Sequence, residues 1–208
     1  MKKKLIILTG PTAVGKTDLS IRLARTVGGE IISADSMQVY RRMDIGTAKI
    51  RPEEMDGVRH HLIDILEPTE SFNAFLFKEY ALKAANEIWE RGSIPIIVGG
   101  TGFYIQTLLY DIEFAKSDEN DGIREELNKL YEEHGAAFLH DMLAKVDPEY
   151  AAEVHENNVK KVIRAIEFYR QTGHKLSEHN TEQRERTSPY NFEYFVLSDD
   201  RAVLYERI

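Results

Sequence analysis

The feature that most constrains this chain is a glycine-bounded segment near its N-terminus, Gly10-Pro11-Thr12-Ala13-Val14-Gly15-Lys16-Thr17. An apolar run, Leu5–Leu8, precedes it and an amphipathic stretch, Asp18–Val27, follows, which predicts a strand, a tight loop and a helix in succession. Backbone N–H groups of such a loop turn around phosphate oxygens, and the helix N-terminus and Lys16 add positive charge. The Thr17 hydroxyl is suited to hold Mg²⁺. The segment therefore predicts a binding loop for a di- or triphosphate and leaves the reaction open.

Short apolar runs alternate with helical patterns through the first half of the chain. We expect strands at Leu5–Leu8, Ile31–Ile32, Leu62–Ile65 and Ile94–Val98, and helices at Thr17–Val27, Asn73–Arg91 and Gly102–Tyr110. This alternation predicts an α/β fold, a P-loop NTPase-like parallel sheet flanked by helices. Ligands of such sheets bind beyond the carboxyl ends of the strands, which points to the loops Gly10–Lys16, Ser33–Tyr40 and Gly99–Thr101.

The pattern changes at about Asp111. Four helices without an intervening strand are expected, at Ile123–His134, Ala136–Val146, Pro148–Val154 and Asn157–Gln171. The polar segment Asn180–Tyr190 is typical of an exposed connection, and Phe192–Leu197 predicts a returning strand. We therefore expect a core of residues 1–111 and 191–208 and an all-helical insertion at 112–190. The sequence stops within a predicted helix that begins at Arg201, which suggests a core that is incomplete at its C-terminus.

Composition sets wide limits. The 208 residues are 42% hydrophobic and 30% charged, as in ordinary globular proteins, and no stretch approaches membrane-spanning length. The absence of cysteine excludes disulfides and thiolate metal sites and favours a cytoplasmic location. The net charge is −8, yet residues 157–190 hold 7 Lys and Arg against 4 Asp and Glu. Because salt screens charge within about 10 Å, such a local patch remains able to bind phosphates.

The loop after the second predicted strand carries a carboxylate, Asp35, with Ser36, Met37 and Gln38. At the end of a strand facing the phosphate loop, a carboxylate can accept a proton or hold a metal through water. The alternative is that Asp35 caps the next turn.

The strand Ile94–Val98 ends in glycines, Gly99-Gly100-Thr101-Gly102, where many phosphate-loop NTPases carry an acidic magnesium ligand. This weakens an ATPase reading and favours close backbone approach by a ligand, with Thr101 donating to an oxygen. A tight strand-to-helix turn capped by Thr101 is the alternative.

Two further features concern histidines and basic residues. His60 and His61 are adjacent on an extended segment, so they face opposite sides and do not chelate one ion together.

On the helix from Asn157, three basic residues share one face and apolar residues form the other. That basic face is either merely solvated or contacts a nucleic-acid backbone. The basic residues are Lys160, Lys161 and Arg164, and the apolar ones Val159, Val162, Ile163 and Ile166.

Six segments in this order closely resemble the bacterial tRNA dimethylallyltransferases, also called tRNA isopentenyltransferases, along essentially the whole chain. They are GPTAVGKT, SADSMQVY, DIGTAK, HHLIDI, PIIVGGTGFYI and NNVKKVIRAIEFYRQTG. The resemblance implies a prenyltransferase that moves a dimethylallyl group from dimethylallyl diphosphate to N6 of the adenosine 3′-adjacent to the anticodon. The phosphate loop would then hold the diphosphate. Mg²⁺, a tRNA anticodon stem-loop and a monomeric, non-membrane enzyme are expected.

The same resemblance assigns roles to residues. Asp35 would accept the N6 proton, and Thr101 would lie near the oxygen that bridges the allylic carbon and the diphosphate. Lys16, the loop amides, Mg²⁺ on Thr17 and Arg124 would stabilise the departing diphosphate. The target base would have to flip out of its stem-loop. The tRNA-contact residues would be Asp35, Ser36, Met37, Gln38, Thr101, Arg124, Val159, Lys160, Lys161, Val162, Ile163 and Arg164.

The chain departs from the family pattern in two ways. Val14 stands where the family usually has serine, and family members continue well beyond residue 208 into further phosphate- and tRNA-binding residues. Two other enzyme classes remain as alternatives: an adenylate isopentenyltransferase acting on free AMP, ADP or ATP, and a phosphate-loop small-molecule kinase. The basic helix favours tRNA over a free nucleotide, and the turn at Gly99–Gly102 argues against the kinase. A non-catalytic phosphate-binding module is the remaining possibility.

Overall fold

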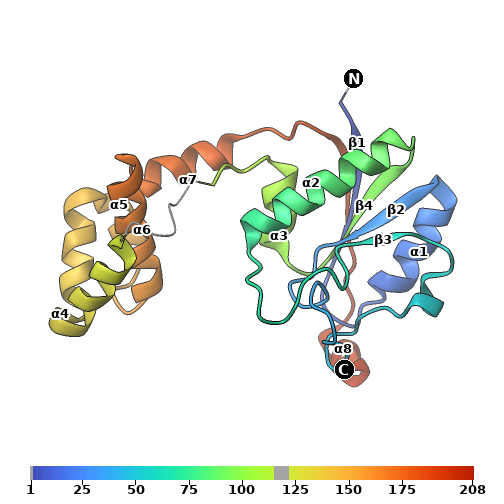
Figure 1. Ribbon diagram of the computed structural model, residues 1–208, viewed down its shortest axis with the longest axis horizontal. Coiled ribbons are helices and arrows are strands. Elements are labelled where there is room, and N and C mark those ends of the chain that lie inside the picture. The colour runs from blue at the N-terminus through green and yellow to red at the C-terminus, as the bar shows by residue number, and fades with distance from the viewer. Residues whose placement is uncertain (1, 115–121) are drawn as a thin grey trace. The chain divides into compact units, whose positions relative to one another are not determined.

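Five parallel strands form a single sheet in the order β3-β2-β4-β1-β5. The computed structural model describes residues 2–114 and 122–208 (Figure 1). The strands are β1 (Lys4–Thr9), β2 (Gly29–Ser33), β3 (His60–His61), β4 (Ile94–Gly99) and β5 (Asn191–Val196). The expected α/β class is confirmed. The expected strand Leu62–Ile65 is wrong, because Leu62 and Asp64 adopt positive φ angles of 64° and 54° that end the extended backbone.

Helices cover both faces of this sheet. The helices of this part are α1 (Lys16–Val27), α2 (Ala74–Glu90) and α3 (Gly102–Leu109), with a short 3₁₀ turn at Pro52–Met55, and α8 (Arg201–Arg207), which buries none of its residues. Ile21 and Ala24 of α1 pack on Ile31 and Ile96, and successive strand residues point to the opposite face, where α2 contacts β2 and β4. Burial of β1, β2 and β4 on both faces explains their continuous apolar runs.

The chain divides into two compact units. The α/β unit comprises Met1–Ile112 and Thr187–Ile208, and the helical unit comprises Glu113–Arg186. The helical unit consists of α4 (Ile123–Val146), α5 (Pro148–Glu153), α6 (Val159–Thr172) and α7 (Leu176–Glu185). Its core joins Leu127, Leu139 and Leu143 of α4 to the apolar face of α6.

Two local features of the helical unit bear on the sequence analysis. Gly135, with φ of 82° and ψ of 179°, interrupts the helical backbone of α4 between the two helices expected there. The segment expected as an exposed connection from Asn180 is instead helical as far as Glu185. Asp147 anchors this helix, because its carboxylate accepts hydrogen bonds from the Ser177 amide at 2.9 Å and the Ser177 hydroxyl at 2.7 Å.

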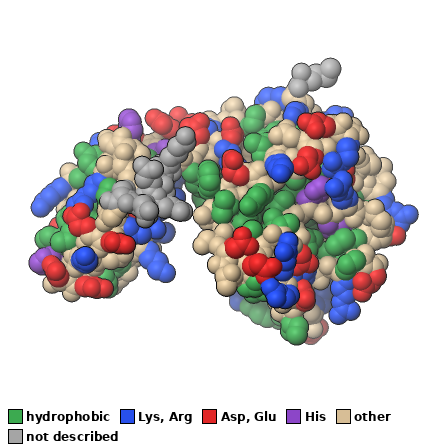
Figure 2. Space-filling view, viewed as in Figure 1, with side chains coloured by type: hydrophobic (Ala, Val, Ile, Leu, Met, Phe, Trp, Pro, Cys, Tyr) green, Lys and Arg blue, Asp and Glu red, His purple; other side chains and the backbone are tan. Residues whose placement is uncertain are grey.

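Exposed apolar side chains occur at two places on the α/β unit. Phe75 and Tyr80 of α2 and Phe103 of α3 are exposed. Figure 2 shows a hydrophobic patch over these two helices. The second place is β5, where Tyr194, Phe195 and Val196 are 42%, 48% and 64% exposed. Strand β5 lies at the edge of the sheet and pairs only with β1 among the described residues.

Candidate functional site

The phosphate loop between β1 and α1 curls because two of its residues adopt left-handed backbone angles. Ala13 has a φ of 65°, and Gly15, the residue that precedes the helix, has a φ of 88°. Glycine tolerates that conformation without the steric cost that a side chain adds. Helix α1 begins at Lys16, so its unpaired N–H groups and positive dipole end face the loop. The predicted loop residues, Gly10 to Thr17, thus form a site for an anion at the carboxyl end of β1.

Lys16 reaches back across this loop. Its ammonium donates to the carbonyl oxygens of Gly10 at 2.9 Å and Pro11 at 2.6 Å. Burial lowers the pKa of Lys16 from its ordinary value, and the negative charge of Asp35 opposes that shift. The lysine of the loop and the carboxylate after β2 are therefore close enough to interact electrostatically.

Asp35 combines both roles that the sequence left open. Its Oδ1 atom accepts hydrogen bonds from the backbone amides of Met37 at 2.8 Å and Gln38 at 3.2 Å, so the carboxylate caps the turn after β2. Within the described part of the chain, Oδ2 has no hydrogen-bond donor, although the residue is half-buried. One oxygen fixes the carboxylate, and the other keeps its accepting capacity.

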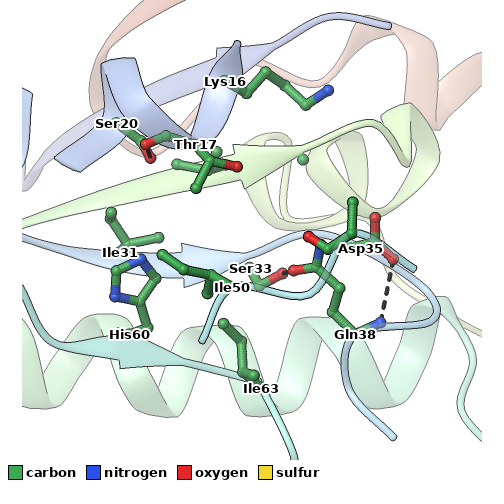
Figure 3. A pocket seen from close by; sticks show the side chains of 13 residues that line it. Lys16, Thr17, Ser20, Ile31, Ser33, Asp35, Gln38, Ile50, His60 and Ile63 are labelled. Atoms are coloured by element: carbon green, nitrogen blue, oxygen red, sulfur yellow. Dashed lines mark hydrogen bonds between the residues drawn. The ribbon is translucent and has the colours of Figure 1, made fainter. Parts of the chain in front are cut away.

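A pocket of about 440 Å³, open solvent at its mouth included, joins the phosphate loop to Asp35. Figure 3 shows Lys16 and Thr17 on one side and Asp35, Ser33 and Gln38 on the other. The remaining wall is largely apolar, from Ile31, Ala48, Ile50, Ile63 and Val98, with Ser20, His60 and Gly99 completing it. Such a pocket suits a ligand that carries an anionic group at one end and an apolar group beside it.

The glycine at the end of β4 has a cause within the fold itself. A Cβ atom on Gly99 would lie 2.2 Å from the carbonyl oxygen of Ala34, so the neighbouring backbone alone requires glycine there. The Thr101 amide donates to the same oxygen at 3.3 Å. The Thr101 hydroxyl makes no capping hydrogen bond at the start of α3, which leaves it available for another partner and argues against the capping alternative.

His60 and His61 face opposite sides of β3, as the extended backbone predicts. The His61 ring contacts Glu30 at 2.8 Å, whereas His60 lines the pocket. Burial lowers the pKa of His60, which favours the neutral ring. Because the Val58 carbonyl can only accept, the Nδ1 atom of His60 donates to it at 2.9 Å, and the neutral ring presents Nε2 as an acceptor.

In the helical unit, the residues expected to contact tRNA fall on two faces of α6. Lys160, Lys161 and Arg164 are exposed and form no ion pair with any described residue. Val162 and Ile163 are 0% and 5% exposed and pack in the helical core with Val159 against them. The burial of this apolar face leaves Lys160, Lys161 and Arg164 as the exposed side chains of the expected contact stretch, and the contact of Val162 and Ile163 with tRNA stays a prediction.

Arg124 lies near the start of α4, where its guanidinium pairs with Glu167 of α6. Glu167 is 8% exposed, so this pair joins α4 to α6 at the edge of the helical core.

A magnesium ion would find oxygen donors at the pocket. Among the described residues, no three His, Asp or Glu side chains gather into a metal site. Thr17 and Asp35 nevertheless both border the pocket. Mg²⁺ retains several waters and needs only one or two protein oxygens beside substrate phosphates, so this donor set fits the ion.

Several residues of the pocket were not singled out from the sequence. The apolar wall at Ile50 and Ile63 comes from loops rather than from periodic elements, so no periodicity marks it. Lys49, whose side chain is only 4% exposed, lies between the pocket residues Ala48 and Ile50 and was not singled out either. The nearby Asp44 and Gly46 were the one indication in the sequence that Lys49 could have a structural role.

The sequence model of the IPP transferase family matches residues 38–208 of this chain. The tRNA dimethylallyltransferase of Lachnoclostridium phytofermentans is 58% identical over 204 residues, which are 98% of this chain and 65% of that protein. That of Finegoldia magna is 50% identical over 208 residues, or 66% of its length. The chain thus spans about 65% of the length of these curated relatives.

Solved structures give the same relationship. A eukaryotic dimethylallyltransferase acting on tRNA superposes with a TM-score of 0.89 at 35% identity, covering 99% of this chain and 50% of that one. The tRNA isopentenylpyrophosphate transferase of Bacillus halodurans gives a TM-score of 0.65 at 47% identity, covering 99% of this chain and 63% of that one. No described helix is both long and apolar enough to cross a membrane.

Proposed function

Because this chain belongs to the IPP transferase family, we propose that the protein transfers a dimethylallyl group from dimethylallyl diphosphate to N6 of the adenosine next to the anticodon in tRNA. The observation that carries the proposal is the pocket between the phosphate loop and Asp35. Its anion-binding end, apolar wall and available carboxylate oxygen match the three parts of that reaction: diphosphate, five-carbon group and acceptor amine.

The transfer forms a bond between N6 and the allylic carbon while the bond from that carbon to the diphosphate oxygen breaks. An aromatic amine is a weak nucleophile, so orienting it and removing its proton are the steps that a carboxylate assists. Asp35 accepts that proton through Oδ2, because Oδ1 already accepts two backbone hydrogen bonds. Diphosphate departs with the bonding electrons.

The phosphate loop receives the negative charge that develops on the leaving group. Lys16, the loop amides and the N-terminus of α1 supply fixed positive charge, and the Thr101 hydroxyl donates to the bridging oxygen. Mg²⁺ held by the Thr17 hydroxyl would add further positive charge to the diphosphate. Arg124 would contribute only by exchanging Glu167 for a phosphate.

Recognition of tRNA is assigned to two surfaces. Asp35, Ser36, Met37, Gln38 and Thr101 would contact the extruded target base and its neighbours, since the base must leave its stack to reach a pocket. On α6, the side chains of Lys160, Lys161 and Arg164 would contact the RNA backbone, where each neutralised phosphate releases counterions. We further propose that the protein acts as a cytoplasmic monomer.

One assay separates this function from its alternatives. The intact protein is incubated with labelled dimethylallyl diphosphate and Mg²⁺ and with unmodified tRNA, AMP or ATP. Label in tRNA supports the proposal, and label in AMP but not tRNA would replace it with an adenylate prenyltransferase. Consumption of ATP with a phosphorylated acceptor and no prenyl transfer would instead establish a kinase.

A further inference from the structure

Lys49 is a buried cation whose donors are all used. Its side chain is 4% exposed, and its ammonium donates to the Tyr40 carbonyl at 2.7 Å, Asp44 Oδ1 at 2.8 Å and Asp64 Oδ1 at 2.6 Å. An ammonium has three N–H donors, and these three acceptors satisfy them. Burial disfavours the charge, but the hydrogen bonds from Lys49 to Asp44 and Asp64 outweigh it and raise the pKa of Lys49. We call these four residues the Lys49 cluster.

The Lys49 cluster ties together two segments that are distant in sequence. Tyr40 and Asp44 precede Lys49 in one loop, whereas Asp64 follows β3. The Asp64 amide also donates to the Gln38 carbonyl at 3.2 Å. The ammonium therefore fixes the loop of residues 38–49 against the segment that follows β3.

The residue before Lys49 shows that this loop needs such an anchor. Ala48 has a φ of 48°, a conformation that is unfavourable for a residue other than glycine and persists only where the surroundings impose it. Asp64 also has a positive φ, of 54°. Lys49 directly follows Ala48 and contacts Asp64, so its ion pair with Asp64 connects the two strained positions.

Ala48 in turn orients the side chain of Gln38. The Nε2 atom of Gln38 donates to the carbonyl oxygens of Thr47 and Ala48, each at 3.2 Å. Because carbonyls only accept, these two contacts set which end of the amide is nitrogen. The Gln38 Oε1 atom then faces Ser33, whose hydroxyl lies 3.3 Å away, beside Asp35 in the pocket (Figure 3).

We propose that Lys49 is a positioning residue for the acceptor base: by holding the Thr47–Ala48 carbonyls, it fixes the amide of Gln38 with Oε1 toward the pocket. The inference rests on the proposed function, since it assigns Gln38 to the base that Asp35 deprotonates. Lys49 itself touches no substrate and acts only through the two carbonyls and Gln38.

A double-mutant cycle in the intact protein tests this inference. Lys49→Met removes the charge while keeping an unbranched apolar stem one atom shorter than lysine, and Asp44 and Asp64 remain hydrated because their side chains are 68% and 49% exposed. We expect kcat/KM for an anticodon stem-loop to fall about tenfold to a hundredfold, as for other small misplacements of a reacting group. The Kd for dimethylallyl diphosphate should not change. In a Gln38→Ala background, Lys49→Met should have no further effect, because its route of action is already lost.

Lys78→Met is the matched control. Lys78 is similarly buried in the same unit, with 13% of its side chain exposed, and donates to Asp111 at 2.6 Å and to the Ile112 carbonyl at 2.9 Å. It should leave kcat/KM unchanged. An equal loss in the control, or a Lys49→Met effect that is additive with Gln38→Ala, overturns the inference.

Two further measurements keep the inference testable. If Lys49→Met does not fold, Asp44→Asn weakens the same cluster and enters the same cycle with a smaller expected loss. If the wild-type protein transfers nothing to RNA, the proposed function fails, and ¹⁵N NMR of the Gln38 side-chain amide still decides the positioning role. Lys49→Met or Asp44→Asn must shift that signal while Lys78→Met leaves it in place; an unmoved signal refutes the role.

Discussion

The two ends of strand β2 each carry a carboxylate, and the two are treated differently by the fold. At the amino end, Glu30 is 9% exposed and is contacted by Arg91 twice, at 2.9 and 2.8 Å, and by His61 at 2.8 Å. At the carboxyl end, Asp35 is fixed through Oδ1 alone. A carboxylate whose two oxygens both accept hydrogen bonds stabilises the fold. A carboxylate with one oxygen that accepts no hydrogen bond can accept a proton from a substrate.

The same contrast recurs on helix α6. Glu167 is buried and paired with Arg124, while Lys160, Lys161 and Arg164 extend from the helix without an ion-pair partner among the described residues. In both regions, the charged side chains that are paired inside the fold stabilise the structure. The charged side chains that the fold leaves unpaired are the candidates for contact with a ligand.

The most severe test of the contrast is Asp35→Asn. The amide oxygen of asparagine still accepts the two backbone hydrogen bonds, so we expect an unchanged melting temperature and an unchanged Kd for dimethylallyl diphosphate. Loss of the base should lower kcat by about 10²–10⁴-fold. Single-turnover transfer to tRNA and calorimetric binding of the diphosphate measure the two quantities. Joint loss of both would show that Asp35 supports the loop rather than the acceptor.

Glu30→Gln tests the other end of the strand. Loss of a charged partner for Arg91 and His61 should lower the free energy of unfolding by about 1–3 kcal/mol, because hydrogen bonds to charged groups contribute that much. Transfer per folded molecule should stay at the wild-type value. Urea denaturation followed by circular dichroism gives the first quantity. Glu67→Gln is the control: Glu67 pairs with Arg41 and Arg42 but is more exposed, so its loss should matter less. A large fall in kcat for Glu30→Gln would remove the contrast.

Lys160→Ala combined with Lys161→Ala extends the test to α6. We expect about tenfold weaker tRNA binding near physiological salt. The slope of log K against log salt should become shallower by about 2, because each of the two lysines neutralises about one phosphate. Lys129→Ala with Lys145→Ala, two exposed lysines of α4, removes the same charge and serves as control. Equal slopes in the two variants would mean that the basic face of α6 is merely solvated.

The smallest expected effect is in the pH dependence of stability. The hydrogen bonds from Arg91 are the main cause of the lowered pKa of Glu30, helped by His61 and opposed by burial. A carboxyl whose pKa is lower in the folded state stabilises the protein above its unfolded pKa, and loses that contribution as the pH falls through the folded value. Unfolding free energies between about pH 6 and pH 3 should therefore fall less steeply in Glu30→Gln than in the wild-type protein. If the unfolding free energies of the two proteins fall in parallel with pH, groups other than Glu30 cause the loss of stability in acid.

Local pattern and long-range packing explain what the sequence could predict. The phosphate loop and the core strands were predictable because backbone conformation and hydrophobic period are local properties. The helix at Leu176–Glu185 was missed because its sequence is polar throughout and its anchor, Asp147, lies 30 residues earlier in the chain. The packing requirement at Gly99 was not predictable for the same reason: the atom it accommodates belongs to Ala34, which directly follows β2. Lys49 escaped notice because its acceptors come together only when the loops fold.

The pairing of β1 with β5 has a consequence for how the protein is made. Leu5 lies opposite Phe192. During synthesis, β1 therefore cannot pair with β5 until nearly all of these residues have left the ribosome. At about 5–20 residues per second, the helices of Glu113–Arg186 emerge, free to pack, before the sheet acquires its last strand. Until then β1 presents an unpaired hydrophobic edge of the kind that chaperones bind. Parallel pairing across such a separation should make docking of β5 the slow step of folding.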